Sequence, residues 1–231
     1  MNETSDWTQQ QLTGIDESHL TAITIDKREV KVHQAVSEAL LSLVHHAAQH
    51  GFELSIASGF RDFERQKMIW NNKYLGVRPI LDIDGNPLDA HSLAPLQRIH
   101  AILRWSALPG ASRHHWGCDF DLYAKNLLPE GVQLQLEPWE YLQGHQAPFY
   151  EWLLTYAPQH GFFFPYAKDK GGVAVEPWHL SHQATSDKAL ATFNSQMLAD
   201  ILRLNPIEGN NEVLMHLDKI YTQYVSNITT S

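Results

Sequence analysis

The sequence predicts an α+β fold, in which helices pack on a small, mainly antiparallel sheet. Three observations lead to this prediction. Residues 114–123 and 173–180 are typical of core strands. Apolar residues at helical spacing occupy segments before and between these strands. Two further amphipathic helices follow in the tail of the chain.

The first part of the chain carries few signals. Residues 1–30 are polar and weakly patterned, and we take them as an N-terminal extension. Within it, the alternating pattern at 20–25 predicts an edge strand. From residue 32 to residue 50, apolar side chains recur at helical spacing, which predicts a helix. Gly51 follows where a C-terminal glycine cap is expected.

The next elements alternate between strand and helix. Residues 52–57 predict a strand, and residues 62–74 predict a helix, so Arg61 would lie where the strand meets the helix. Residues 80–92 are rich in turn formers, which indicates a loop or a small hairpin. A further helix is predicted at 95–108, where a Pro-Gly pair ends it.

The rest of the chain is predicted to be mainly helical. Residues 148–160 carry aromatic and apolar side chains at helical spacing, so a helix is expected between the two core strands. The tail helices are expected at 186–204 and 211–225, separated by helix-breaking residues. We therefore divide a single domain into a core at 31–185 and a C-terminal helical segment at 186–231.

The composition limits the classes of function. The 231 residues are 43% hydrophobic and 19% charged, as in ordinary globular proteins. A net charge of -9 argues against nucleic acid as a partner. The single cysteine, Cys118, excludes an internal disulfide and a cysteine-rich zinc site, and we expect it to be buried and inert. No export signal or membrane span is recognisable, so we expect a cytoplasmic protein, with a periplasmic location and the oligomeric state left open.

The segment from Ser112 to Asp121 concentrates histidines and carboxylates around Gly117, a composition typical of metal sites. If the chain turns at this glycine and continues as a strand, Asp119 and Asp121 project to the same face, because strand side chains alternate. One of these carboxylates can then face a metal ion that is also held by His114.

A third ligand is expected from a distant segment. Catalytic zinc takes three nitrogen or oxygen ligands and keeps a fourth position for water. The motif Glu-Pro-Trp-His supplies His179 and, three residues before it, Glu176. We predict that His114, Asp121 and His179 hold one Zn²⁺ and that Glu176 takes the proton of the zinc-bound water. This chemistry hydrolyses a peptide bond, and negative charge develops on the carbonyl oxygen as the water attacks. Arg61 is the candidate that stabilises this charge.

Three motifs in this order resemble those of the VanY-like D-alanyl-D-alanine carboxypeptidases, a family of zinc peptidases. They are SGFRDFERQ at 58–66, SRHHWGCDFD at 112–121 and EPWH at 176–179. The family pattern is Ser-x-His-x-x-Gly-x-x-x-Asp followed by Glu-x-x-His. It matches Ser112, His114, Gly117, Asp121, Glu176 and His179.

The resemblance implies the same zinc ligands and general base, and it implies roles for other residues. Arg61 would stabilise the carbonyl oxygen, and Gln66 and Ser112 would place the terminal groups of the substrate. Asp119 departs from the pattern of many of these carboxypeptidases, which carry alanine there, and is closer to the murein endopeptidase relatives. We therefore include Asp119 among the candidate substrate-binding residues.

The function implied by the resemblance is zinc-dependent hydrolysis of peptidoglycan stem peptides or their precursors, by a D-alanyl-D-alanine or L,D-carboxypeptidase. Dipeptidase and murein endopeptidase relatives offer alternative activities. A zinc-containing binding module without turnover, as in hedgehog-like relatives, is the alternative outside enzymes. Glu176 and Arg61 favour an enzyme, because a binding module needs neither a free carboxylate nor a cation beside the ion.

Two features near these motifs have structural interpretations. Glu-Pro-Trp-Glu at 137–140 repeats the start of the later motif without its histidine, so we expect a loop followed by packing aromatic residues. His115 adjoins a predicted metal ligand, and we expect it to pack or to lie on the surface.

Overall fold

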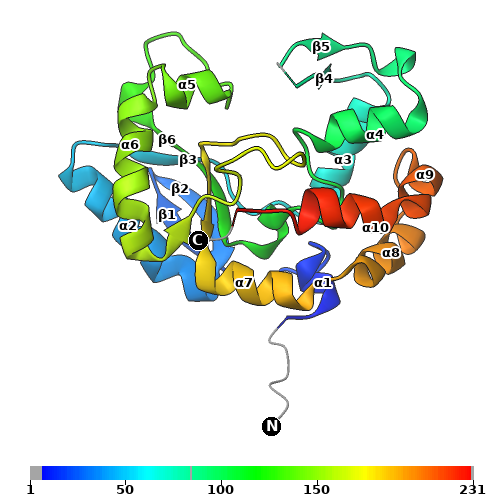
Figure 1. Cartoon of the computed structure of the whole chain (residues 1–231). Helices are drawn as coiled ribbons and strands as arrows, with labels where there is room; N and C mark the ends of the chain where they lie inside the picture. Colours follow the sequence, from blue (N-terminus) through cyan, green and yellow to red (C-terminus); the bar gives the residue numbers. More distant parts are fainter. Residues whose placement is uncertain (1–6, 84, 230–231) are drawn as a thin grey trace.

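The computed structural model describes residues 7–83 and 85–229, which form a mixed α+β fold, as the sequence predicts (Figure 1). The strands are β1 (Leu20–Ile25), β2 (Arg28–His33), β3 (Leu54–Ser58), β4 (Ile80–Leu81), β5 (Pro87–Leu88), β6 (Asp119–Ala124), β7 (Phe162–Phe163) and β8 (His179–His182). The helices are α1 (Gln9–Leu12), α2 (Ser37–Gln49), α3 (Phe63–Tyr74), α4 (Pro95–Leu103), α5 (Pro138–Leu142), α6 (Ala147–Tyr156), α7 (Gln183–Thr192), α8 (Ser195–Leu204), α9 (Asn210–Met215) and α10 (Leu217–Ile220).

The main sheet has four antiparallel strands in the order β3-β6-β8-β7. Its two central strands, β6 and β8, bury Phe120, Leu122 and Leu180 completely. In the register of this pair, Asp121 lies directly opposite His179. The sheet therefore joins two segments that are far apart in the chain at the point where the predicted metal ligands lie.

The edge strand predicted at 20–25 is confirmed, but it belongs to a hairpin with β2 that the sequence did not predict. The two turn residues, Asp26 and Lys27, have φ angles of 48° and 60°, as in a tight hairpin turn. Val32 therefore lies in a strand, and α2 begins only at Ser37. The helix predicted from residue 32 to residue 50 was wrong in its first turn, because the hairpin partner captures that segment.

The helices surround the sheet in two groups. Figure 1 shows α2 and α6 on one side, whereas α3, α4 and α8 to α10 gather on the other side of the molecule. The hairpin of β4 and β5 and the short helix α5 stand opposite each other at the top of this view. Among the described residues, no helix is long and apolar enough to cross a bilayer.

The helix predicted at 62–74 is confirmed as α3. The side chain of Asp62 caps it by accepting a hydrogen bond from the backbone N–H of Arg65 at 2.6 Å. Arg61 thus lies between β3 and this helix, as expected. The predicted hairpin at 80–92 is present as β4 and β5, and the helix predicted at 95–108 ends earlier, at Leu103.

The two predicted core strands are shorter than expected. Arg113–Trp116 form a 3₁₀ turn, so β6 begins only at Asp119. The second strand begins at His179, after the Glu-Pro-Trp stretch, because Pro177 cannot donate a hydrogen bond to a strand neighbour.

The C-terminal helical segment contains more and shorter helices than the two that were expected. The helix predicted at 186–204 is divided into α7 and α8, because the chain is extended at Phe193 and the Asn194 side chain caps α8 by accepting from the backbone N–H of Met197 at 3.0 Å. The helix predicted at 211–225 is divided into α9, α10 and a final π turn at Tyr221–Val225.

Candidate active site

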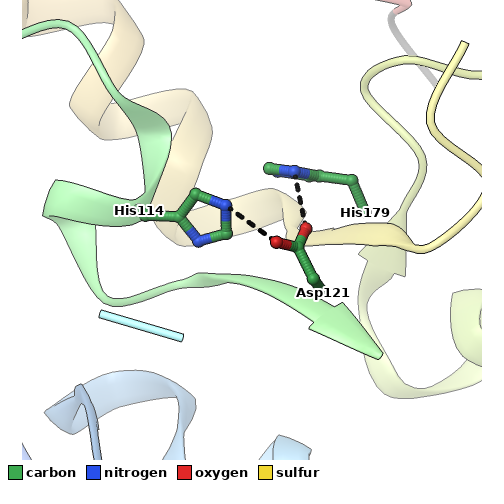
Figure 2. A group of neighbouring side chains, drawn as sticks. All are labelled: His114, Asp121 and His179. Carbon is green, nitrogen blue, oxygen red and sulfur yellow. Dashed lines mark ion pairs between the residues drawn. The ribbon is translucent and has the colours of Figure 1, made fainter. Parts of the chain in front are cut away.

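His114, Asp121 and His179 point toward one another (Figure 2). His114 Nε2 lies 3.5 Å from Asp121 Oδ2, and His179 Nδ1 lies 3.3 Å from Asp121 Oδ1. One ring nitrogen or carboxylate oxygen from each residue lies within 4.8 Å of the others, and all three side chains are buried. The structure therefore brings together the three residues that the sequence predicts as metal ligands.

Gly117 determines how the turn that carries His114 enters the sheet. Its φ angle of 68° is in the left-handed region, which glycine adopts without a steric penalty. A Cβ atom at this position would lie 2.4 Å from Leu20 Cδ2 and 2.9 Å from the backbone nitrogen of His33. Only glycine therefore allows this turn to pack against the β1–β2 hairpin and to continue directly into β6.

Asp119 orients both imidazole rings. His114 Nδ1 donates to the backbone carbonyl of Asp119 at 3.2 Å, and His179 Nε2 donates to Asp119 Oδ1 at 2.9 Å. These bonds leave His114 Nε2 and His179 Nδ1 facing Asp121. Contacts of this kind fix the tautomer and the direction of metal-binding histidines.

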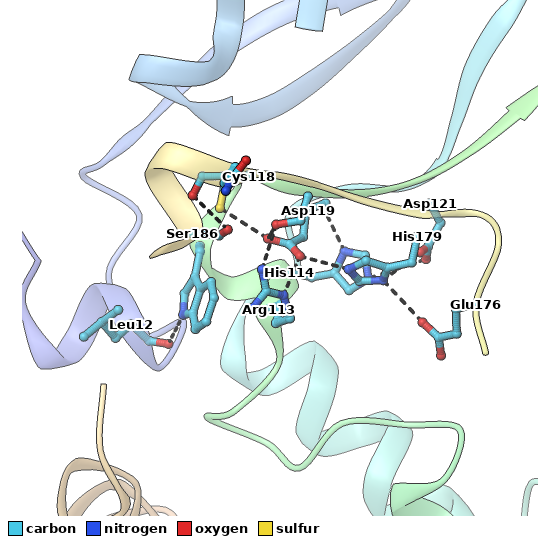
Figure 3. A network of polar contacts seen from close by, with 12 residues as sticks. Leu12, Arg113, His114, Cys118, Asp119, Asp121, Glu176, His179 and Ser186 are labelled. Carbon is cyan, nitrogen blue, oxygen red and sulfur yellow. Dashed lines mark hydrogen bonds and ion pairs between the residues drawn. The ribbon is translucent and has the colours of Figure 1, made fainter. Parts of the chain in front are cut away.

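The Asp119 carboxylate is fully buried in a polar network (Figure 3). It also accepts from Arg113 Nε at 2.7 Å and from Ser181 Oγ at 3.1 Å. Burial opposes its ionisation, but Arg113 and His179 hold the pKa of Asp119 well below its usual range. Asp119 is not among the residues that line the cavity, and it contacts the two histidines. The expected contact of Asp119 with a substrate stays a prediction.

Glu176 lies beside the three candidate ligands. Its Oε2 atom is 3.4 Å from His179 Nδ1, and its side chain is 13% exposed, toward the cavity that it lines. Burial raises the pKa of Glu176 above its usual value, and His179 partly opposes this rise. A carboxyl group with a raised pKa is suited to accept a proton and return it near neutral pH. Its place is the one expected for the general base.

Arg61 is held in a fixed orientation beside the candidate ligands. Its guanidinium donates to Gln66 Oε1 at 2.7 Å and to Ser58 Oγ at 2.8 Å, and its backbone N–H donates to the carbonyl of His114 at 3.2 Å. Burial lowers the pKa of Arg61, and the carboxylates of Asp121 and Glu176 oppose this effect. Arginine stays charged under such conditions.

Gln66 does not reach the space available to a substrate. Its side chain is fully buried, and its Nε2 atom donates to the carbonyl of Ala107 at 2.6 Å. Both ends of the amide are therefore engaged, one by Arg61 and one by this carbonyl. Gln66 supports Arg61, whereas the sequence analysis expected it to contact the substrate.

The candidate site opens into a cavity of about 780 Å³. Ser112 lines this cavity, and its buried hydroxyl has no hydrogen-bond partner among the described residues. A hydroxyl in this state can bind a polar group of a ligand without first breaking another bond. Ser112 is thus placed as expected for a substrate contact.

Several residues of the cavity wall had no role in the sequence analysis: Lys73, Arg78, Trp139, Tyr166 and Trp178. The ring of Tyr166 lies 5.0 Å from that of His179, and burial raises the pKa of this phenol to about 12, so it stays a neutral donor. Trp139 belongs to the Glu-Pro-Trp-Glu repeat, which does form packing contacts but also reaches the cavity. Trp178 could have been found, because it lies inside the Glu-Pro-Trp-His motif.

The charges and donor atoms fit a zinc ion. Burial lowers the pKa of His114 to about 3, so its ring is neutral, as a ligand requires. Burial opposes a charge on His179, but the carboxylates of Asp119, Asp121 and Glu176 raise its pKa well above the usual value. Three carboxylates around one buried imidazole demand positive charge, which a divalent cation supplies. Asp121 Oδ1 has no hydrogen-bond partner among the described residues, and two imidazoles with one carboxylate are a ligand set typical of catalytic zinc.

Comparisons with known sequences agree with these motifs. The family model described as VanY, D-alanyl-D-alanine carboxypeptidase, matches residues 29–185. An uncharacterised protein of Haemophilus influenzae is 34% identical over 121 residues, which are 51% of this chain and 92% of that protein. A D-alanyl-D-alanine carboxypeptidase of Enterococcus faecalis is 26% identical over 150 residues, which are 64% of this chain and 46% of that protein.

Solved structures show the same fold. VanYB in complex with D-alanine-D-alanine has a TM-score of 0.52 and 22% identity, over 73% of this chain and 80% of that chain. The VanY D,D-pentapeptidase in complex with Zn(II) has a TM-score of 0.51 and 22% identity, over 75% of this chain and 86% of that chain. The LD-carboxypeptidase LdcB has a TM-score of 0.52 and 20% identity, over 84% of this chain and 76% of that chain.

The family match extends over well over half of the chain and includes all three motifs that carry the candidate site. The sequence-based identification of the family is therefore confirmed. This chain belongs to the VanY family of D-alanyl-D-alanine carboxypeptidases.

Proposed function

We propose that this protein is a zinc-dependent carboxypeptidase that removes the C-terminal residue from peptidoglycan peptides containing D-amino acids. One observation carries the proposal. In a chain of this family, His114, Asp121 and His179 converge within 4.8 Å, and Glu176 and Arg61 line the same cavity beside them. A site that only bound metal would need neither of the last two residues.

The reaction that we propose is hydrolysis of a peptide bond. His114, Asp121 and His179 would hold the zinc ion, which when bound supplies a Lewis acid for the scissile carbonyl and for water. Glu176 accepts a proton from the attacking water and later delivers it to the nitrogen of the leaving amine, so no proton is gained or lost overall. The water oxygen first forms a bond to the carbonyl carbon, and the carbon–nitrogen bond then breaks as the amine nitrogen takes the proton and the carbonyl is restored in the new carboxylate.

Arg61 and Ser112 complete the proposed mechanism. Negative charge develops on the carbonyl oxygen during the attack, and a fixed guanidinium in a buried site stabilises such charge strongly. Gln66 and Ser58 hold Arg61 in place, so little reorganisation is needed when the charge appears. The unpartnered hydroxyl of Ser112 is available to orient the substrate.

The test is a product analysis by mass spectrometry on synthetic stem tri-, tetra- and pentapeptides. Zinc-loaded wild-type protein should release one residue from the C-terminus. Glu176→Gln has nearly the same shape but cannot take the proton, so it should keep one zinc ion per chain and lose about 10²- to 10⁴-fold in kcat. If both proteins hold zinc and neither cuts any peptide, the proposal of an enzyme fails and a zinc-containing binding module becomes the better interpretation.

The same products separate the alternative activities. Release of two residues would indicate a dipeptidase, and cleavage of a crosslinked dimer would indicate a murein endopeptidase. Cleavage of the pentapeptide alone would indicate D,D-specificity, whereas cleavage of the tetrapeptide alone would indicate L,D-specificity. We favour single-residue release because the family match is to carboxypeptidases.

A further inference from the structure

The cavity continues beyond the candidate metal ligands to a wall formed by one face of α3. Gln66, Ile69 and Lys73 are spaced by three and four residues, so they lie on the same face of this helix. Gln66 fixes the guanidinium of Arg61, while Ile69 and Lys73 line the cavity. The helix that supports Arg61 therefore also presents a lysine to the space available for the substrate.

Lys73 and Arg78 form what we call the cationic wall of the cavity. Lys73 is half-buried, and its Nζ atom donates to the hydroxyl of Ser106 at 2.6 Å. Arg78 lines the same cavity, and its side chain is exposed. No carboxylate within residues 7–83 and 85–229 forms an ion pair with either side chain. Among the described residues, these two cations thus border the cavity without a direct ion-pair partner, and Glu176 is the carboxylate that acts on Lys73 from a distance.

The electrostatics of Lys73 suit an anionic ligand. Burial and, to a smaller extent, the charge of Arg78 lower the pKa of Lys73 to about 8, and only Glu176 opposes them. A half-buried ammonium group loses hydration, and an opposite charge nearby would offset that loss. A negatively charged ligand would therefore be stabilised at this wall more than a neutral one.

The substrate of a carboxypeptidase always brings such a charge, because its last residue has a free carboxylate. The other cations that line the cavity are engaged elsewhere: Arg61 is held beside the metal ligands, and Arg113 is paired with Asp119. We propose that the cationic wall binds a carboxylate of the substrate, with Lys73 as the main contact. This inference rests on the proposed function and adds the residue that selects for an acidic group.

The carboxylate could be the C-terminal one or that of an acidic side chain in the stem peptide, and three peptides distinguish the two. The first is a stem pentapeptide that ends in D-Ala-D-Ala with a free acid. The second has a C-terminal amide, and the third has a free C-terminus but amidated acidic side chains. Activity should fall on the peptide that lacks the carboxylate bound by the cationic wall.

The experiment compares wild type, Lys73→Met and Lys67→Met, all loaded with zinc. Lys67 is the matched control, because it lies on the same helix but does not line the cavity. Lys73→Met should lose about 10- to 100-fold in kcat/KM on the all-acid peptide, since it removes a hydrogen bond between charged groups. On the peptide that lacks the recognised carboxylate, it should differ from wild type by less than about twofold. Lys67→Met should match wild type on all three.

Equal losses on all three peptides, or no loss on any, would overturn the inference. Lys73→Arg keeps the positive charge and guards against a purely structural effect. It should retain most of the preference for the acid, and all variants should unfold at similar temperatures. If Lys73→Arg loses that preference as completely as Lys73→Met does, charge is not what the wall contributes.

A binding measurement separates this inference from the proposed function. In a Glu176→Gln background, calorimetry measures the affinity for each peptide without turnover. If wild type cuts no peptide but Lys73→Met weakens binding of the acid alone, the proposed function fails and the carboxylate site stands. If wild type releases one residue but affinity for acid and amide is the same with and without Lys73, the inference fails and the proposed function stands.

Discussion

The cavity has one side with the candidate metal ligands, which we call the metal side, and a cationic wall, and the two are built differently. The metal side consists of His114, Asp121 and His179, together with Asp119, which contacts both histidines without lining the cavity. All four residues are buried on β6, on β8 and on the turn before β6. The cationic wall comes from the end of α3 and the loop after it, where Arg78 is exposed. Groups that must keep a fixed geometry thus lie on paired strands. Groups that select a substrate can lie on segments whose sequence varies without disturbing the sheet.

The most severe test of the metal side is the removal of one candidate ligand. We expect His114→Ala to lower bound zinc from one ion per chain to almost none, because two remaining ligands do not retain the ion. Activity should fall by more than about 10³-fold. His45 is an exposed histidine of α2, so His45→Ala is the control and should keep both the bound zinc and the activity. Elemental analysis and a peptide assay measure the two effects, and full zinc content in His114→Ala would contradict the predicted ligand set.

A second test separates positioning from stability within the metal side. Asp119→Ala should weaken zinc binding by about 10- to 100-fold, because His179 loses the acceptor that orients it. It should also lower the free energy of unfolding by roughly 3–5 kcal/mol, because Arg113 stays buried without its partner. The double variant with Arg113→Met should recover much of the stability but not the zinc affinity. Urea unfolding measures the stability, and zinc titration measures the affinity. If the double variant recovers both stability and zinc affinity, Asp119 does not act through His179.

Arg61 bonds to the carbonyl of His114 and to the Gln66 side chain on α3, so its replacement shows to which of the two regions it belongs. Arg61→Met should lower kcat by about 10²- to 10³-fold with little change in KM and in zinc content, as expected for a group that stabilises a developing charge. Arg65→Met, in an exposed arginine one turn further along, is the control. A rise in KM without a change in kcat would instead place Arg61 with the substrate-selecting groups.

The smallest effect is expected at the outer edge of the cavity. Trp139 is 52% exposed and lies on the short helix α5. Trp139→Ala should raise KM by less than about fivefold and leave kcat unchanged, because a ring that stays half in water contributes little binding energy. Leu142→Ala, an exposed residue of the same helix, should have no effect. A large fall in kcat for Trp139→Ala would show that the outer edge takes part in the chemistry.

The residues with a local backbone signal were the predictable ones. Gly117 and Pro177 mark the turns that carry His114, Glu176 and His179, so the motifs, the ligand chemistry of zinc and the family resemblance together were enough to predict that these side chains converge. The α+β class and the family were also predicted correctly, and the family match extends over residues 29–185. The role of each side chain in binding or catalysis stays a prediction, as do the domain boundaries and the expected cytoplasmic location.

The contacts across the sheet and between helices could not be predicted. The alternation along β6 correctly indicates that Asp119 and Asp121 share a face, but it does not show that Asp119 meets His179 and Arg113 from other segments. Gln66 matched a family position, yet its partners Arg61 and Ala107 come from the loop before α3 and from the loop after α4. Lys73 belongs to no motif, so only its place in the cavity draws attention to it.

The secondary-structure predictions were wrong where another interaction competed with the helical pattern. The segment that begins at Val32 has helical spacing, but pairing with β1 holds its start in a strand. In the tail, a local interaction decides the outcome instead, because the capping side chain of Asn194 interrupts a continuous helical pattern. The hairpin residues and Asn194 are present in the sequence, but hydrophobic periodicity alone does not show that strand pairing or capping will prevail over a continuous helix.

The direct pairing of Asp121 with His179 has a consequence for how the chain reaches its final structure. If β8 slipped by one residue against β6, the imidazole would turn to the opposite face of the sheet and the ligand set would be lost. A bound ion would therefore favour the single correct alignment of these two strands, which are far apart in the sequence, and it would add to stability only in that alignment. A metal ion at the candidate site would therefore also select the correct register of the sheet.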